Sequence, residues 1–136
     1  MTPETRTLVQ YRLERAREAL AEAVVLLDSG HANTGVNRLY YACFYAVSAL
    51  LLTKGLTATR HSSLRTLFLR HVIRAGLLPL VQGQLYDRLF DQRQQSDYAD
   101  LVHFDVHEVR SWCGEAQAFV DAVAVLIQQA LESSFP

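Results

Sequence analysis

The sequence is poor in cysteine and shows no signal-peptide pattern. Its 136 residues include only two cysteines, Cys43 and Cys113, and each lies within an apolar stretch. Such cysteines are typical of buried, reduced thiols in a cytoplasmic protein. No segment near the N-terminus has the apolar core of a signal peptide, so we expect a cytoplasmic protein.

Strong charge and long apolar segments are also missing. The formal net charge of −1 gives no global field that would recruit nucleic acid, although it allows a local basic patch. The longest apolar run, around residues 39–52, is interrupted by Ser48 and is too short to span a bilayer. We therefore expect a buried helix there and no membrane association.

Patterns that mark β-structure and several catalytic folds are absent. No stretch alternates between polar and apolar residues, and there is no internal repeat or low-complexity segment. Neither a glycine-rich phosphate loop nor the nucleophile elbow of a serine hydrolase occurs. The length suits a single domain that covers residues 1–136.

Apolar residues instead recur at helical spacing in five segments, which predicts an all-α, up-and-down bundle of four long helices plus a shorter fifth helix. Gly30, Gly55 and Gly76 end the first three segments, and the second is apolar almost all round, as in the central helix of a bundle. Pro79 suits the first turn of the fourth segment, whose pattern fades after Arg93. The face expected to be buried in the first segment consists of Leu8, Tyr11, Ala16, Ala19, Leu20, Ala23, Val24 and Leu27.

The last segment begins near two histidines whose spacing is typical of zinc ligands. His103 and His107 lie four residues apart, but Asp105 and Glu108 form an acidic variant of a capping box that starts the helix at Asp105. The two rings then need not share a face. We favour loop and helix-start histidines, and we expect neither a metal nor a cofactor.

Four aromatic residues crowd little more than one turn of the second segment, namely Tyr40, Tyr41, Phe44 and Tyr45. An aromatic stripe at this spacing is usually core, but so many tyrosines cannot all point inward, because a buried hydroxyl needs a hydrogen-bond partner. The alternative is a helix interface with a partner chain. An exposed patch of this kind favours a homodimer.

Four stretches together resemble the HEPN domain family. They are "NRLYYACFYAVSALLLTKGL", "TRHSSL", "FDQRQQSDY" and, in the last segment, "EAQAFV". Their joint order carries the resemblance, which implies a helical bundle that dimerises. Many HEPN proteins are ribonucleases, frequently toxins of toxin–antitoxin or defence systems, and their usual partner is a small nucleotidyltransferase. Their active pattern is an arginine followed a few residues later by a histidine, and the two meet across the dimer cleft.

The resemblance places Arg93 at the position of the family's arginine, but Tyr98 stands where the histidine is expected. Metal-independent RNA cleavage needs a base for the 2′-hydroxyl proton and a cation for the phosphorane. Arginine suits the second task, whereas tyrosine, with a reference pKa of about 10, is a poor base. Asp97, four residues after Arg93, offers a structural salt bridge as a competing role.

One further residue matches the family pattern, and two others form a loose arginine–histidine pair. His61, at the start of the third segment, corresponds to a histidine typical of this HEPN branch, and a hydrogen bond to the loop backbone is its structural alternative. Arg65 and His71 match a looser arginine–histidine pattern. Within one helix they point about 120° apart, so we interpret them as solvated residues beside a core stripe.

Three functions stay open from the sequence. The leading one is a homodimeric nucleotide- or RNA-binding or regulatory module, paired with a small nucleotidyltransferase in a toxin–antitoxin-like system, that binds through Arg93, Tyr98 and His61. In that case we expect Arg93 to be partly exposed. The alternative is an active metal-independent endoribonuclease, a toxin, in which RNA cleavage is catalysed by Arg93, Tyr98 and either Asp97 or His103. The third is a scaffold bundle without a ligand.

Overall fold

The computed structural model describes residues 1–98 and 101–133, apart from the side chain of Tyr98. Within these ranges all regular secondary structure is helical, which confirms the all-α prediction. None of the described helices combines the length and apolarity needed to cross a bilayer. The elements are α1 (Pro3–Asp28), α2 (Ala32–Thr53), α3 (His61–Phe68), the π-helical turn η1 (Leu69–Ile73), α4 (Leu80–Tyr98) and α5 (Val106–Ser133).

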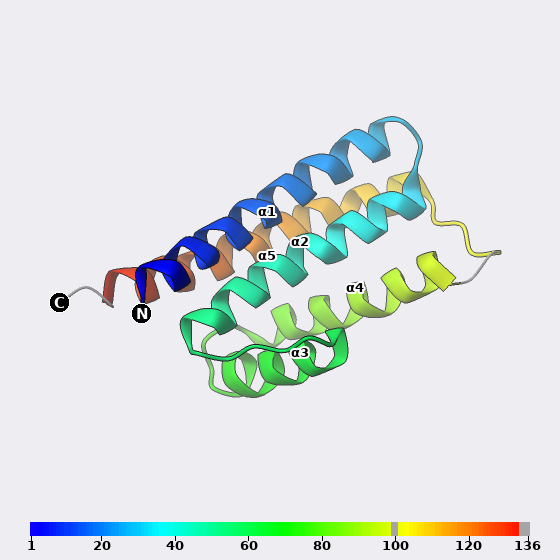
Figure 1. Ribbon diagram of the computed structural model, residues 1–136. Helices are drawn as coiled ribbons and strands as arrows, with labels where there is room; N and C mark the ends of the chain where they lie inside the picture. The colour runs from blue at the N-terminus through cyan, green and yellow to red at the C-terminus, as the bar shows by residue number, and fades with distance from the viewer. Residues whose placement is uncertain (99–100, 134–136) are drawn as a thin grey trace.

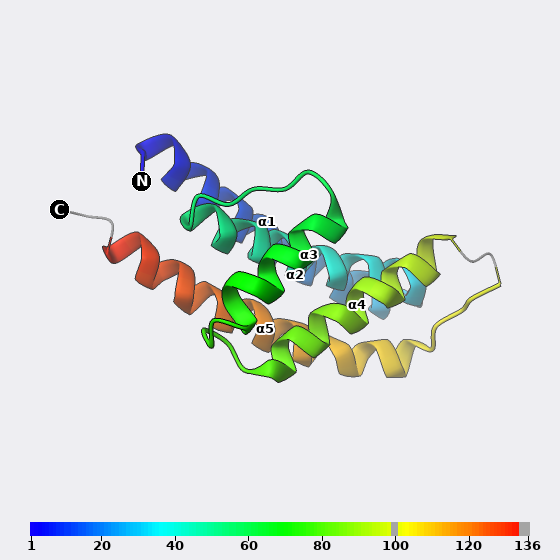
Figure 2. The same ribbon diagram turned by 90° about the horizontal axis from the view of Figure 1, so that it is seen from below.

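The four long helices alternate in direction, as Figure 1 shows. Helix α2 is central, because it contacts each of the other α-helices, and α1 and α5 also contact each other. The short α3 and η1 pack against α2 and α4 (Figure 2). This arrangement brings the start of α3 and the second half of α4 to the same side of α2.

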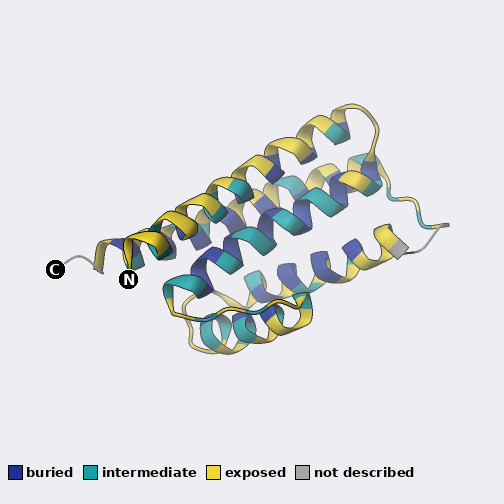
Figure 3. Ribbon diagram, in the orientation of Figure 1, coloured by how far each residue is buried: buried dark blue, intermediate teal, exposed yellow. Residues whose placement is uncertain are grey.

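The sequence explains why α2 is central. Buried residues lie all round this helix, and Figure 3 shows it dark blue or teal for most of its length. Helix α1 buries mainly small side chains, and Ala16, Ala19 and Ala23 let it lie close against its neighbours. At the turn between the two helices the approach is so close that a Cβ added to Gly35 would lie 2.9 Å from Cδ2 of Leu27.

The predicted helix ends are confirmed. Gly30, Gly55 and Gly76 have positive φ angles of 82°, 74° and 76°, a conformation that costs glycine less than other residues. The Oδ1 atom of Asp105 accepts the backbone N–H groups of the second and third residues of α5, at 2.8 and 3.1 Å. Asp105 therefore caps α5 as its sequence context predicts.

The predicted buried face of α1 is confirmed for five of its eight residues, Ala16, Ala19, Leu20, Ala23 and Leu27, and is wrong for the other three. Leu8, Tyr11 and Val24 are exposed, while Val9 is buried. Helix α1 carries apolar residues on more than one face, so periodicity alone leaves the edges of its buried face open, and contact with α2 and α5 decides them. Cys113 is also less buried than expected from the sequence: it is half-buried, whereas Cys43 is buried.

Phe119 of α5 should be a main contributor to stability. Its side chain has 0% exposure, and its ring lies 5.8 Å from that of Phe68 and 6.0 Å from that of Tyr86. Phe119→Ala is expected to lower the free energy of unfolding by about 3–5 kcal/mol, because it removes buried apolar surface and leaves a cavity. Urea unfolding followed by circular dichroism measures the change.

The matched control is Val125→Ala on the same helix. Val125 is 57% exposed, so its truncation should change the free energy of unfolding by less than about 0.5 kcal/mol. Equal losses in the two variants would contradict the described orientation of α5.

Candidate functional site

Arg93 lies on α4 with its guanidinium against an aromatic wall. The guanidinium carbon is 4.8 Å from the ring centroid of Tyr40 on α2 and 5.9 Å from that of Phe90. These distances are within the range of cation–π attraction. Arg93 is only 7% exposed, which corrects the expectation that it would be partly exposed. Its guanidinium is covered by Phe90, one turn earlier on α4, and by Tyr40 of α2.

Few hydrogen bonds compensate this burial. Nη1 of Arg93 reaches Oδ2 of Asp97 at 3.5 Å, and Nε has no hydrogen-bond partner in the part of the chain that the structure describes. The predicted pairing of residues four apart on the helix is therefore present, but at the long limit of a hydrogen bond. A buried cation with an unsatisfied donor is costly, so this arginine retains capacity for a further acceptor.

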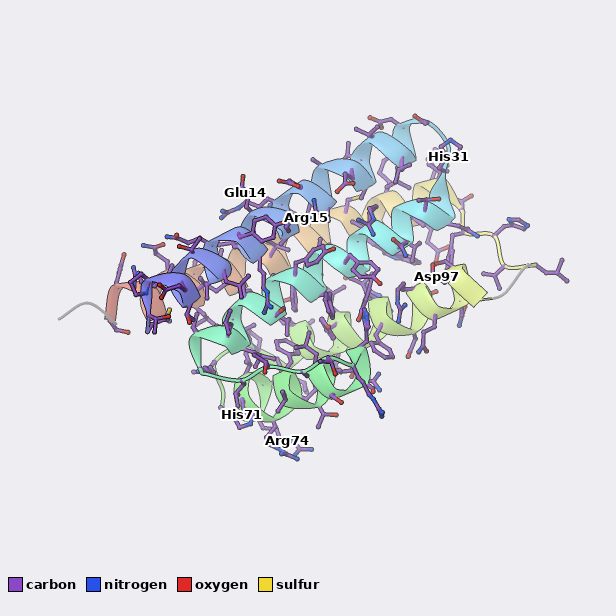
Figure 4. The ribbon with its side chains drawn as sticks, in the orientation of Figure 1. Glu14, Arg15, His31, His71, Arg74 and Asp97 are labelled. Carbon is purple, nitrogen blue, oxygen red and sulfur yellow. The ribbon has the colours of Figure 1, made fainter. Side chains whose placement is uncertain are left out.

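Asp97 links α4 to α2. It accepts from Nδ2 of Asn37 at 3.2 Å as well as from Arg93, and Figure 4 shows it at the end of α4 that faces the start of α2. The remaining oxygen of Asn37 accepts from Nε and Nη2 of Arg38, at 3.1 and 2.9 Å. A short polar chain thus runs from Arg93 through Asp97 and Asn37 to Arg38.

His61, the first residue of α3, completes the site from the other side. Its Nδ1 lies 2.7 Å from the hydroxyl of Tyr40, the same residue whose ring lies under Arg93. The imidazole also stacks on the ring of Phe44, with centroids 4.5 Å apart and planes 23° apart. The structural alternative proposed from the sequence, a bond to loop backbone, is thus replaced by a bond to a side chain.

The pKa shifts in this group define its proton positions. Burial, helped by the positive charge of Arg93, lowers the pKa of His61, so the imidazole is neutral at pH 7. Burial raises the pKa of Tyr40 to about 12, so its hydroxyl keeps its proton. We therefore assign Tyr40 as the donor and Nδ1 of His61 as the acceptor, which places the single N–H proton of the neutral ring on Nε2.

Two arginines that sequence reasoning did not place here extend the site. The guanidinium of Arg65 lies 4.1 Å from the ring centroid of Phe90 and 3.8 Å from Asp87, so it is held in the site rather than solvated. The guanidinium of Arg38 lies 5.0 Å from the ring centroid of Tyr41. The sequence signal that could have placed Arg65 in this site is its spacing, because Arg65 follows His61 by four residues and shares its helix face.

Some predicted residues are not brought into this group. Tyr98 ends α4, and its side chain lies outside the described residues, so its role stays a prediction. His103 precedes α5 and His107 lies in its first turn, as expected from the cap. In the described ranges no three histidine, cysteine or carboxylate side chains gather as metal ligands would.

The arrangement is therefore a cationic, aromatic surface built from three helices. Arg38 and Tyr41 come from α2, Arg65 and His61 from α3, and Arg93 from α4. Guanidinium groups on aromatic faces suit phosphate oxygens and stacked bases, whereas a neutral imidazole with a proton on Nε2 can donate one further hydrogen bond.

A family model for the HEPN domain matches residues 9–132, which run from the first buried residue of α1 to the end of α5. The chain belongs to the HEPN domain family. The resemblance drawn from the four sequence stretches is thereby confirmed, and Arg93, His61 and the aromatic run all lie inside the matched HEPN region.

Relatives match this HEPN chain over nearly its whole length. A UPF0332 protein of Thermotoga maritima is 40% identical over 125 residues, which cover 92% of this chain and 95% of that protein. A protein of Methanocaldococcus jannaschii named "Putative toxin MJ0605" is 28% identical over 131 residues, or 96% of this chain and 97% of its own. A UPF0332 protein of Gloeobacter violaceus is 31% identical over 132 residues, 97% of each chain. The chain is thus a HEPN module of the kind found in proteins that carry toxin names.

The electrostatic effect of Arg93 on His61 can be measured by titration. Because the charge of Arg93 helps to lower the pKa of His61, Arg93→Gln should raise that pKa toward the ordinary histidine value of about 6.5. NMR of the imidazole Cε1–H gives the midpoint in both proteins. Arg74→Gln, a distant exposed arginine in Figure 4, should leave it unchanged.

The lowered pKa of His61 also makes the stability of the fold depend on pH. The unfolded chain takes up the His61 proton at a higher pH than the folded one, so the free energy of unfolding should fall as pH drops below about 6.5. This loss should be smaller in Arg93→Gln. An unaltered His61 midpoint in that variant would contradict the described site.

Proposed function

We propose that this HEPN chain is an RNA-binding toxin module that works as a homodimer and holds a phosphate of the RNA strand at Arg93. The observation that carries the proposal is the buried guanidinium with an unsatisfied Nε and only one long contact to Asp97. A phosphate oxygen can replace that contact with a stronger, charge-assisted hydrogen bond. Tyr98 and His61 then complete the ligand-binding group predicted from the sequence.

The surroundings of Arg93 support an RNA ligand. Arg38 and Arg65 lie on the same three-helix surface, and each rests on an aromatic ring. Single-stranded RNA is commonly bound by cations that follow the backbone and by rings on which bases stack. The near-neutral chain has no global field, so such binding depends on this local group of arginines.

The homodimer has its own support. Tyr40 is buried, but Tyr41, Phe44 and Tyr45 remain half-buried at the surface of α2. This fits the expectation that so many tyrosines cannot all point inward. A two-fold contact at Tyr41 would bring two Arg93 sites together and cover that ring. The names of the relatives support a role among toxins, and a small nucleotidyltransferase is the partner we propose.

One observation favours RNA cleavage as a second candidate. His61 supplies, from another helix, a neutral histidine near Arg93. A neutral imidazole can accept a proton near pH 7. In the described state Nδ1 is occupied by the Tyr40 hydroxyl, so the ring is oriented to donate from Nε2. Binding without cutting is therefore the better supported function.

Loss of the Arg93 charge should weaken RNA binding. Arg93→Gln is expected to reduce affinity for single-stranded RNA by about 1.5–3 kcal/mol, the range for a hydrogen bond to a charged group. Fluorescence anisotropy with a labelled RNA measures it, and circular dichroism checks the fold. Arg74→Gln removes the same charge from an exposed residue that directly follows η1 and should have little effect.

Three outcomes would each contradict a part of this proposal. Equal weakening by Arg93→Gln and Arg74→Gln would mean that charge alone matters. A single chain of 15.4 kDa in sedimentation at micromolar concentration would contradict the homodimer. Co-purification from the native host tests the nucleotidyltransferase partner, and its absence from the captured proteins would contradict that part.

Restoring a histidine after Arg93 tests the chemistry. Tyr98→His should give RNA cleavage in chelator while the parent gives none, because the imidazole pKa lies near neutrality and that of tyrosine near 10. Product analysis on a gel measures the cut. Cleavage by the parent that is lost in Tyr98→Phe or His61→Gln would instead establish an active endoribonuclease.

A further inference from the structure

A second pocket, separate from the Arg93 site, lies between α1, α2 and the connection from α2 to α3. We call it the α1–α2 pocket. It has a volume of about 330 Å³, within the range of small-molecule sites in proteins. Its polar and aromatic lining comes from Tyr11, Arg12 and Arg15 of α1, from Tyr45 and Ser48 of α2, and from Thr57 of the connection.

The pocket is cationic. Arg12 and Arg15 line it, and no carboxylate among the described residues does. Nη1 of Arg12 donates to the hydroxyl of Ser48 at 2.8 Å, and within residues 1–98 and 101–133 Arg12 has no ion pair. Arg15 pairs with Glu18, which is outside the lining, and rests 5.3 Å from the ring centroid of Tyr45. At least one half-buried guanidinium therefore lacks an anion.

The pocket is also aromatic. Tyr11 of α1 is 58% exposed and lines the pocket. Together with Tyr45 and Phe44 it gives the lining ring faces beside the arginines. Figure 4 shows Arg15 on the side of α1 toward α2, whereas Glu14 stands on the outer side. The exposed tyrosine that contradicted the predicted face of α1 is thus part of a recess.

We propose that the α1–α2 pocket binds a nucleoside phosphate, with the phosphate on Arg12 and Arg15 and the base against Tyr11 and Tyr45. Arginine pairs with phosphate through directed, charge-assisted hydrogen bonds, and aromatic side chains stack on any base. The hydroxyls of Ser48 and Thr57 supply neutral partners for the sugar. The ligand comes either from solution as a mononucleotide or as the terminal nucleotide of an RNA.

The pocket meets the Arg93 site at one residue. Phe44 lines the pocket, and its ring also stacks on His61 at 4.5 Å. An occupant of the pocket therefore touches one wall of the site described above without using Arg93. The proposal consequently does not depend on RNA binding at Arg93.

The test is an NMR titration of the ¹⁵N-labelled chain with 5′-AMP, adenosine and inorganic phosphate. Saturable shifts from 5′-AMP should appear at the backbone amides of Thr57 and Ala58, which line the pocket. Arg12→Gln should weaken 5′-AMP binding by about tenfold or more. Tyr11→Ala should weaken it by about fivefold or more, and because Tyr11 is exposed, this substitution should leave the fold intact. Adenosine and phosphate alone should each bind at least about tenfold more weakly than 5′-AMP, since each lacks half of the contacts.

Two variants separate this site from other effects. Arg17→Gln removes an equal charge from an exposed position of α1 outside the lining and should leave 5′-AMP affinity within about twofold. Arg93→Gln should also leave 5′-AMP affinity unchanged, even if it abolishes RNA binding. A trinucleotide with and without a 5′-phosphate distinguishes the sources: preference for the phosphorylated trinucleotide over 5′-AMP indicates an RNA end, and the reverse indicates a mononucleotide.

The proposal is overturned by any of three results. One is the absence of saturable shifts at millimolar 5′-AMP. Another is equal weakening by Arg12→Gln and Arg17→Gln. The last is loss of 5′-AMP binding in Arg93→Gln with retention in both Arg12→Gln and Tyr11→Ala.

Discussion

The burial of one cation, Arg93, against the ring of Tyr40 is the constraint on which the site depends. A buried guanidinium needs compensation, and the ring of Tyr40 and the carboxylate of Asp97 provide it only in part. Tyr40 can serve because α2 is central in the bundle and is packed on several sides. Its hydroxyl in turn fixes the ring of His61 at the start of α3. Three helices are thus tied together around a single charge.

The fold could be predicted from the sequence because helical periodicity and helix ends are local signals. Gly30, Gly55, Gly76 and Asp105 each mark an end through the conformation or hydrogen bond of a few neighbouring residues. The edges of the buried face of α1 could not be predicted in the same way, because its apolar residues occupy more than one face. Only contact with α2 and α5 decides that Val9 is inside and Tyr11 outside.

The site was predictable only in part. Arg93 and Asp97 lie on one helix, so their pairing follows from spacing alone. The contacts of Arg93 with Tyr40, and of Tyr40 with His61, join residues on three helices, and no local pattern carries them. The family pattern calls for a histidine five residues after Arg93, where the sequence has Tyr98. The structure instead brings a histidine from α3, His61, to Tyr40, whose ring also contacts Arg93.

The central claim is that the guanidinium of Arg93 receives an RNA phosphate, and the Nε–H resonance of this residue tests it most directly. In the described structure this Nε has no hydrogen-bond partner among the described residues. Titration of the ¹⁵N-labelled chain with a short single-stranded RNA should shift the Arg93 Nε–H signal with the same affinity that anisotropy gives. An unchanged Arg93 signal at saturating RNA, with shifts confined to exposed arginines such as Arg74, would contradict the account.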